Sequence, residues 1–139
     1  IPGPIPITSL LQLMLGAPYP GGGGNVLHAQ VRYFDPDRQR PGLPPDLAAL
    51  VEEINPEGIT LTLVNTNPVS TRKVIVQAGA YAEHETVAVA AGGRQIEVAD
   101  SHFTVDLQPG AGERLSIRMK RFVNQPTFRF PWNRQAAPK

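Results

Sequence analysis

The chain has 139 residues and a formal net charge of +1, with 13 Lys and Arg against 12 Asp and Glu. A nucleic-acid-binding protein usually shows a clustered basic excess. The basic residues of 114–121 fall mostly on the polar side of one expected strand instead. The absence of cysteine excludes disulfides, thiolate zinc sites and cysteine nucleophiles. No apolar run approaches the ~20 residues of a membrane span. We therefore expect one domain with its own core, no nucleic-acid partner and no membrane span.

The first 54 residues read as a connecting segment that is rich in proline and glycine. A short helix is expected over residues 10–15, because capping residues precede it and Gly16 follows it. A strand is expected over residues 26–34, and a second short helix over residues 47–54 with prolines in its first turn. The chain begins with Ile rather than Met. We therefore expect it to be processed, or to be the C-terminal fragment of an enzyme.

Apolar and polar residues alternate repeatedly between residues 58 and 119. The side chains of a strand turn to opposite faces with a period of two, so the alternation predicts half-buried antiparallel strands. The expected strands cover residues 58–65, 72–78, 80–90, 94–99, 102–107 and 113–122, with a hairpin at Gly92-Gly93.

Such a series of short strands is typical of an all-β fold, here an antiparallel two-sheet sandwich of the immunoglobulin-like kind. The sandwich domain is assigned to residues 55–139, which end in an aromatic tail. Residues 1–54 carry the two short helices and are expected to pack on the sandwich or on a neighbour. Both ends of the chain are expected to be extended and rich in proline and glycine.

The alternation also predicts which side chains are buried, because a slip of one residue would exchange the two faces of a strand. The buried side chains are expected to be Leu61, Leu63, Val74, Val76, Val105, Leu115 and Ile117. The exposed ones are expected to be Thr60, Thr62, Lys73, Glu97, Arg118 and Lys120.

Three runs within residues 55–122 form a recognisable pattern: LTLVNTN at 61–67, RKVIVQAG at 72–79 and LQPGAGERL at 107–115. The pattern resembles the C-terminal β-sandwich domains appended to bacterial carbohydrate-active enzymes, glycoside hydrolases especially. The resemblance implies a module without catalytic residues, which packs against the catalytic domain of a larger parent protein. It also implies an extracellular or periplasmic location, and it transfers no functional residue to this chain.

Glu83, His84 and Glu85 form the densest group of titratable residues. In a strand, the two carboxylates would share one face and His84 would take the other. Two neighbouring carboxylates suit a hard cation such as Ca²⁺, and His84 suits a transition metal or proton transfer. The alternative is a solvated strand end with no cofactor.

Aromatic residues offer a second kind of site. Tyr33, Tyr81 and Trp132 are candidates for a carbohydrate platform, because flat rings suit the apolar faces of sugars. The alternative is that the aromatic residues cover the sheet or a neighbouring domain, as they do in most proteins.

The two ends of the chain carry apolar residues that lie outside the strand pattern. A helix over residues 10–15 would be apolar nearly all round and would have to be buried. We expect these ends to form an interface through Leu10, Leu11, Met14, Leu15, Phe128, Phe130 and Trp132.

The expected function is a non-catalytic accessory module that stabilises or positions a larger enzyme. One alternative is a carbohydrate-binding module. The other is a subunit of a homo-oligomer assembled through its apolar ends.

Overall fold

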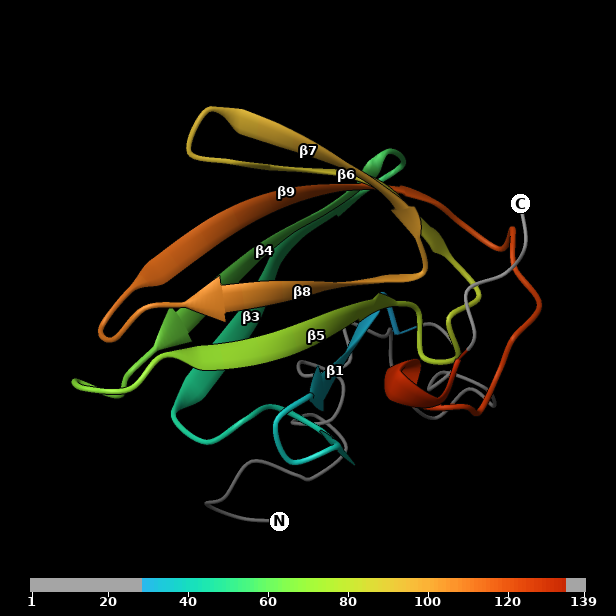
Figure 1. Ribbon diagram of the computed structural model, residues 1–139. Helices are drawn as coiled ribbons and strands as arrows, with labels where there is room; N and C mark the ends of the chain where they lie inside the picture. Colours follow the sequence, from blue (N-terminus) through green and yellow to red (C-terminus); the bar gives the residue numbers. More distant parts are fainter. Residues whose placement is uncertain (1–28, 135–139) are drawn as a thin grey trace, which may run out of the picture.

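The computed structural model describes residues 29–134, which form two antiparallel sheets packed face to face (Figure 1). The four-stranded sheet has the order β2 (Arg40–Pro41), β1 (Val31–Asp35), β5 (Arg72–Ala78) and β8 (His102–Leu107). The five-stranded sheet has the order β3 (Leu47–Asn55), β4 (Gly58–Asn65), β9 (Gly112–Lys120), β6 (Glu85–Ala91) and β7 (Arg94–Asp100). A 3-10 helix, η2 (Pro131–Asn133), follows β9. The prediction of an all-β fold with two antiparallel sheets is confirmed.

The core lies between the two sheets and is built from alternate positions of their strands. Leu61 and Leu63 of β4 and Ile117 of β9 meet Val74 and Val76 of β5 across the interior, and all five are buried. Leu115 of β9 is also buried. The expected register of β4, β5 and β9 is therefore confirmed.

Three of the predicted exposures differ from the structure. Val105 is half-buried rather than buried, because β8 is the edge strand of its sheet. Thr60 and Thr62 are half-buried rather than exposed, because β4 lies between β3 and β9 and neighbouring side chains cover its outer face. The other four predicted exposed residues are exposed: Lys73, Glu97, Arg118 and Lys120.

The strand pairs are nested inside one another along the chain. Strands β6 and β7 form a hairpin, β5 pairs with β8 around it, and β4 pairs with β9 around both. The outermost pair brings β9 to the centre of the five-stranded sheet, between β4 and β6. Along the chain from β4 to β9, every connection therefore passes from one sheet to the other, except the tight β6–β7 turn.

The helix predicted for residues 47–54 is wrong, because these residues form β3. Leu47, Ala49 and Val51 pack against the core, and β3 pairs with β4 along its length. Asp46 has a φ of 67°, which interrupts any helical backbone that the preceding prolines would start. Pairing with β4 therefore decides the conformation over local propensity. A domain boundary at residues 54/55 would cut this β3–β4 hairpin.

The remaining expectations hold at most strand ends but fail at three places. Strand β1 begins at Val31, although Ala29 and Gln30 were expected to belong to it. Strands β4, β5 and β8 begin and end as predicted, and the Gly92-Gly93 hairpin joins β6 to β7. Residues 80–84 form a turn instead of the first half of a strand, and β9 ends at Lys120 instead of residue 122. The helix predicted for residues 10–15 lies outside the described residues.

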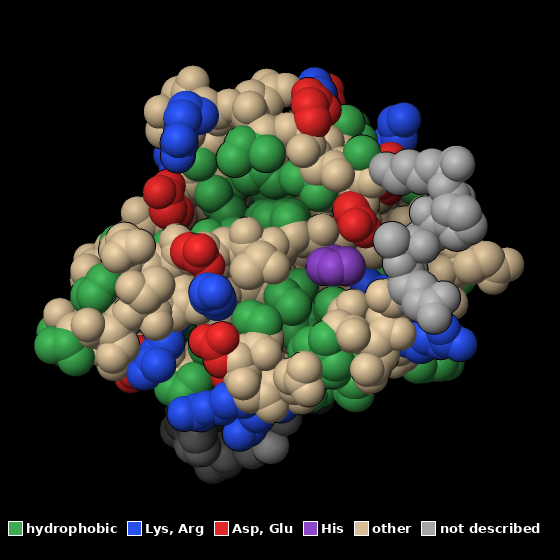
Figure 2. All heavy atoms as spheres, viewed as in Figure 1, with side chains coloured by type: hydrophobic (Ala, Val, Ile, Leu, Met, Phe, Trp, Pro, Cys, Tyr) green, Lys and Arg blue, Asp and Glu red, His purple; other side chains and the backbone are tan. Residues whose placement is uncertain are grey.

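The five-stranded sheet is wider than its partner, so the β6–β7 hairpin overhangs β8. Ile96 lies opposite the buried Val89, yet its side chain is 61% exposed because no strand of the other sheet lies beneath it. Figure 2 shows hydrophobic side chains in the hollow between this hairpin and the four-stranded sheet.

The segment after β9 returns across the outer face of the four-stranded sheet (Figure 1). Phe130 and Trp132 stack on one another at 5.2 Å, and both rings meet Phe34 of β1 edge-on. The Arg134 guanidinium donates hydrogen bonds to the buried Gln77 side chain and to the Arg129 carbonyl. The tail thus covers an apolar part of β1 and β5. Within the described residues, no helix is long and apolar enough to cross a membrane.

Truncation of the core gives a direct test of this register. Ile117→Ala should cost about 2–5 kcal/mol of unfolding free energy, because it leaves a cavity between the sheets. Ile96→Ala is the matched control, since it removes the same atoms from an exposed site and should cost less than about 0.5 kcal/mol. Urea unfolding measures both. Equal losses would contradict the burial assigned here to the two positions.

Candidate functional site

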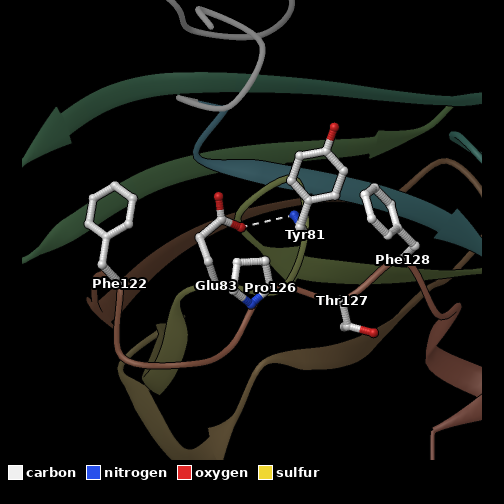
Figure 3. A pocket seen from close by; sticks show the side chains of 6 residues that line it. All are labelled: Tyr81, Glu83, Phe122, Pro126, Thr127 and Phe128. Carbon is white, nitrogen blue, oxygen red and sulfur yellow. Dashed lines mark hydrogen bonds between the residues drawn. The ribbon is translucent and has the colours of Figure 1, made fainter.

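A cavity lies where the turn before β6 meets the segment after β9 (Figure 3). Its volume is about 360 Å³. The lining residues are Tyr81, Glu83, Phe122, Pro126, Thr127 and Phe128. We call it the aromatic pocket. The two segments are about 40 residues apart in sequence but are adjacent in space, because β6 and β9 are neighbours.

The turn of residues 79–84 is held in shape by its own side chains. Gly79 has a φ of +87° and Ala82 a φ of 59°, so the backbone twice enters the left-handed region. Oε1 of Glu83 accepts a hydrogen bond from the Tyr81 amide at 2.9 Å. The carboxylate also packs against the Cα of Gly79, where a Cβ would overlap it. Glycine is therefore required at position 79 for Glu83 to keep this place.

Polar contacts fasten the segment after β9 to the turn. The Asn124 side chain donates to the carbonyls of Ala82 and His84, and the Asn124 amide donates to the Glu83 carbonyl. The Phe122 amide donates to Nδ1 of His84 at 3.0 Å, and the Phe122 ring meets the imidazole edge-on. The pocket therefore has a fixed backbone frame.

His84 acts as a hydrogen-bond acceptor in this frame, which requires Nδ1 to be unprotonated. Burial lowers the pKa of His84, and the nearby charge of Arg121 lowers it further, although the Glu83 carboxylate acts in the opposite direction. The imidazole is therefore neutral at pH 7 and contributes no positive charge to the pocket.

Glu83 is the only acidic residue among those that line the pocket. Its side chain is buried, with 5% of the residue exposed, and within the described chain it forms no ion pair. Oε1 accepts the Tyr81 amide, and the other oxygen points away from that bond into the space between the rings (Figure 3). A buried carboxylate normally has a cation or several donors beside it.

Aromatic rings form the walls around this carboxylate. Tyr81 and Phe128 meet edge-on with ring centres 5.1 Å apart, on one side of Glu83 in Figure 3. Phe122 lies on the other side, and Pro126 lies between. Phe122 is 68% exposed and Phe128 is 85% exposed, so the pocket opens to solvent through apolar surface.

Comparison with known proteins identifies no relative of this chain. No family model, no curated protein and no solved structure matches the chain significantly. The function must therefore be argued from the geometry alone.

The three candidate carbohydrate residues do not form one platform. Tyr33 of β1 packs against the core, where burial raises the pKa of its hydroxyl. Trp132 lies against Phe34 on the outer face of the same sheet. Tyr81 is part of the aromatic pocket.

The three candidate metal ligands are also separated. Glu83 and His84 lie in the turn rather than in a strand, and His84 uses Nδ1 to accept the Phe122 amide. Glu85 is the first residue of β6, opposite Lys120 of β9. Among residues 29–134, no group of three or more His, Cys, Asp or Glu side chains is arranged to hold a metal ion.

The predicted interface residues have different surroundings. Phe130 and Trp132 cover β1, whereas Phe128 is exposed beside Tyr81. The three rings do not form one continuous surface, because residues 126–130 are not a strand and Phe128 lies apart from the other two. The other predicted interface residues lie outside the described part of the chain: Leu10, Leu11, Met14 and Leu15.

Sequence reasoning missed Phe122, Pro126 and Thr127 as site residues. Phe122 was assigned to the last strand, although its φ of 58° ends the extended conformation. A signal was present in Asn124 and Pro126, which favour a turn directly after the strand. Nothing in the sequence shows that this turn meets residues 79–84.

The contact between Gly79 and Glu83 predicts a specific effect of adding one methyl group. Gly79→Ala should destabilise the protein by more than Gly93→Ala, although both positions have a positive φ. The left-handed backbone alone costs about 1–2 kcal/mol, and a Cβ at residue 79 adds a clash with the carboxylate that costs about 1–3 kcal/mol. Nothing lies within 4 Å of a Cβ at Gly93. Thermal unfolding of the two variants measures the difference, and equal losses would contradict this packing.

The neutral state of His84 predicts a pH dependence. Its folded pKa lies below the unfolded value of about 6.5, so the unfolded chain binds the proton more readily as the pH falls. Stability from His84 is therefore present above about pH 6.5 and is lost below it. His84→Asn keeps an acceptor but does not titrate. Urea unfolding at pH 7.5 and 5.5 should show a larger loss for wild type than for the variant, and identical losses would exclude this role.

Proposed function

We propose that the chain is a non-catalytic β-sandwich module that stabilises or positions a larger, carbohydrate-active enzyme. The observation that supports this function most directly is the apolar surface around the mouth of the aromatic pocket. Phe122, Val123 and Phe128 are 68%, 53% and 85% exposed and lie in one segment. Large exposed apolar residues grouped in this way usually mark an interaction surface.

The polar interior supports a structural role rather than a catalytic one. The Asn65 side chain donates to the carbonyls of Ser70, Leu107 and Gln108, and its oxygen accepts the Asn67 amide. The Gln77 side chain donates to the carbonyls of Gly79 and Ala80. These buried groups fasten loops to strands, and their hydrogen-bonding capacity is used by the fold itself.

The proposal also includes the topology of the β-sandwich. In immunoglobulin domains, the last two strands are neighbours in one sheet. Here β8 and β9 lie in different sheets, and the pairs β4–β9, β5–β8 and β6–β7 are nested. This order favours a shortened jelly roll over the immunoglobulin-like arrangement, and jelly rolls also occur as lectin domains.

Carbohydrate binding is the second candidate function, and the rings of the aromatic pocket favour it. Tyr81, Phe122 and Phe128 are grouped in one cavity, and Glu83 offers an acceptor for a sugar hydroxyl. Assembly of identical chains through the same apolar surface is a third candidate with the same exposed residues.

The accessory role predicts that the apolar surface matters to the parent protein. Phe122→Ser combined with Phe128→Ser should lower the thermal midpoint of the catalytic domain in the complete parent protein, because a neighbouring domain loses its apolar contact. Differential scanning calorimetry measures the midpoint, and activity on glycoside substrates gives a second reading.

Val69→Ser is the control for this experiment, since Val69 is 80% exposed and lies in the loop before β5. It should leave the midpoint unchanged. A double variant that behaves like this control would refute docking through Phe122 and Phe128. Binding of the unmodified chain to a polysaccharide, lost in the double variant, would favour the carbohydrate function instead.

A further inference from the structure

The unpaired carboxylate of Glu83 is the starting point for a second inference. The acidic side chains that form ion pairs with arginine are on the surface: Asp46 meets Arg72 at 3.2 Å, and Glu52 meets Arg114 at 3.1 Å. Asp35 is as deeply buried as Glu83, but its carboxylate accepts two backbone amides. Glu83 accepts one amide and leaves its second oxygen facing an apolar cavity.

Cations near the pocket do not satisfy this carboxylate. Arg121, which directly precedes the lining residue Phe122, has its guanidinium bound to the Gln30 side chain and to the carbonyls of Pro56 and Gly58. His84 is neutral because its Nδ1 accepts the Phe122 amide. The side chains that line the pocket therefore give it a net negative charge inside walls of aromatic rings.

We propose that the aromatic pocket binds an alkylammonium group, with the nitrogen at the free oxygen of Glu83 and the apolar stem between the rings of Phe122 and Phe128. The faces of aromatic rings carry negative potential, so the rings of Tyr81, Phe122 and Phe128 attract a cation that lies over their faces. An apolar stem suits the rest of the lining, which has Pro126 and the Thr127 methyl group.

The lining of the pocket suits an anion or a sugar less well than an alkylammonium group. An anion would be repelled by Glu83, and no cationic side chain lines the cavity. A sugar needs several donors and acceptors, whereas the other polar groups in the lining are only the hydroxyls of Tyr81 and Thr127, and the Thr127 oxygen accepts the Arg129 amide. One carboxylate surrounded by rings corresponds to a ligand with one charged donor.

Two sources share this chemistry: a free amine and the lysine side chain of a protein partner. The inference holds for either source and does not depend on the accessory role. If the accessory role is correct, a lysine of the neighbouring domain would be the occupant.

The test uses the full 139-residue chain and two probes of equal stem length, n-butylammonium chloride and 1-butanol. Amide NMR spectra follow the titration, and the Tyr81 amide is the specific reporter because it donates to Glu83. Butylammonium should shift this signal saturably at constant ionic strength. Butanol should bind at least about tenfold more weakly, since charge-assisted hydrogen bonds contribute about 1.5–3 kcal/mol.

Two substitutions separate the carboxylate from general effects of charge. Glu83→Gln keeps an acceptor for the Tyr81 amide and should weaken butylammonium binding by about tenfold or more. Glu85→Gln makes the same change of net charge outside the pocket and should leave binding unchanged. Phe128→Leu removes an exposed ring without disturbing the core and should weaken binding about two- to fivefold.

The results distinguish the proposal from its alternatives. Equal binding of the two probes, or loss of binding in Glu85→Gln as large as in Glu83→Gln, would overturn it. If Glu83→Gln does not fold, the Phe128→Leu variant decides by itself. Butylammonium binding equal to that of wild type would then overturn the proposal. Saturable shifts with glucose but none with butylammonium would overturn it in favour of a sugar site. A peptide with one lysine would identify a protein as the source of the amine if it binds more tightly than butylammonium. It must also bind more tightly than the same peptide with norleucine in place of lysine.

Discussion

Strand β9 can lie at the centre of its sheet only because Gly58 has no side chain. A Cβ at this position would overlap the Ile117 carbonyl, so the start of β4 approaches β9 more closely than any other residue type allows. Arg121 also holds the start of β4, since its guanidinium donates hydrogen bonds to the carbonyls of Pro56 and Gly58. The β4–β9 pairing buries Leu61 and Ile117 in the core and also sets the direction in which the chain leaves the sheet after Lys120.

That exit direction creates the candidate site. From Arg121 onward the chain runs beside the turn that precedes β6, where the side chains of Asn124 and His84 join the two segments through hydrogen bonds to the backbone. The same tail then crosses the outer face of the four-stranded sheet, where the Arg134 side chain binds that of Gln77. One end of the molecule therefore combines a rigid polar frame with exposed aromatic rings and a buried acidic group. Elsewhere, the buried polar side chains described above are used to hold the fold together.

The sequence predicts the fold where local chemistry decides it. Strands β5 and β8 have the expected limits because alternation and turn residues define both ends, and Gly92-Gly93 specifies the β6–β7 hairpin. It fails for β3, because residues 47–55 become a strand through pairing with β4, and a short apolar run fits a helix equally well. Three residues of the candidate site were named from the sequence, but for different roles: Tyr81 for carbohydrate, Glu83 for a metal and Phe128 for an interface. The remaining part of the site depends on two turns that meet through β6–β9 pairing, which no local pattern encodes.

The nested strand pairs have a consequence for how this chain reaches its native state. Among the three nested pairs, the β6–β7 hairpin closes the shortest loop, so its ends can meet at the smallest entropic cost. Once it forms, β5 and β8 are already close, and after them β4 and β9. Assembly can thus proceed outward from this hairpin, because each strand pair that forms shortens the loop that the next pair has to close. The central strand of the larger sheet, β9, is then among the last to dock, and until that moment both of its future neighbours, β4 and β6, present open edges to other chains.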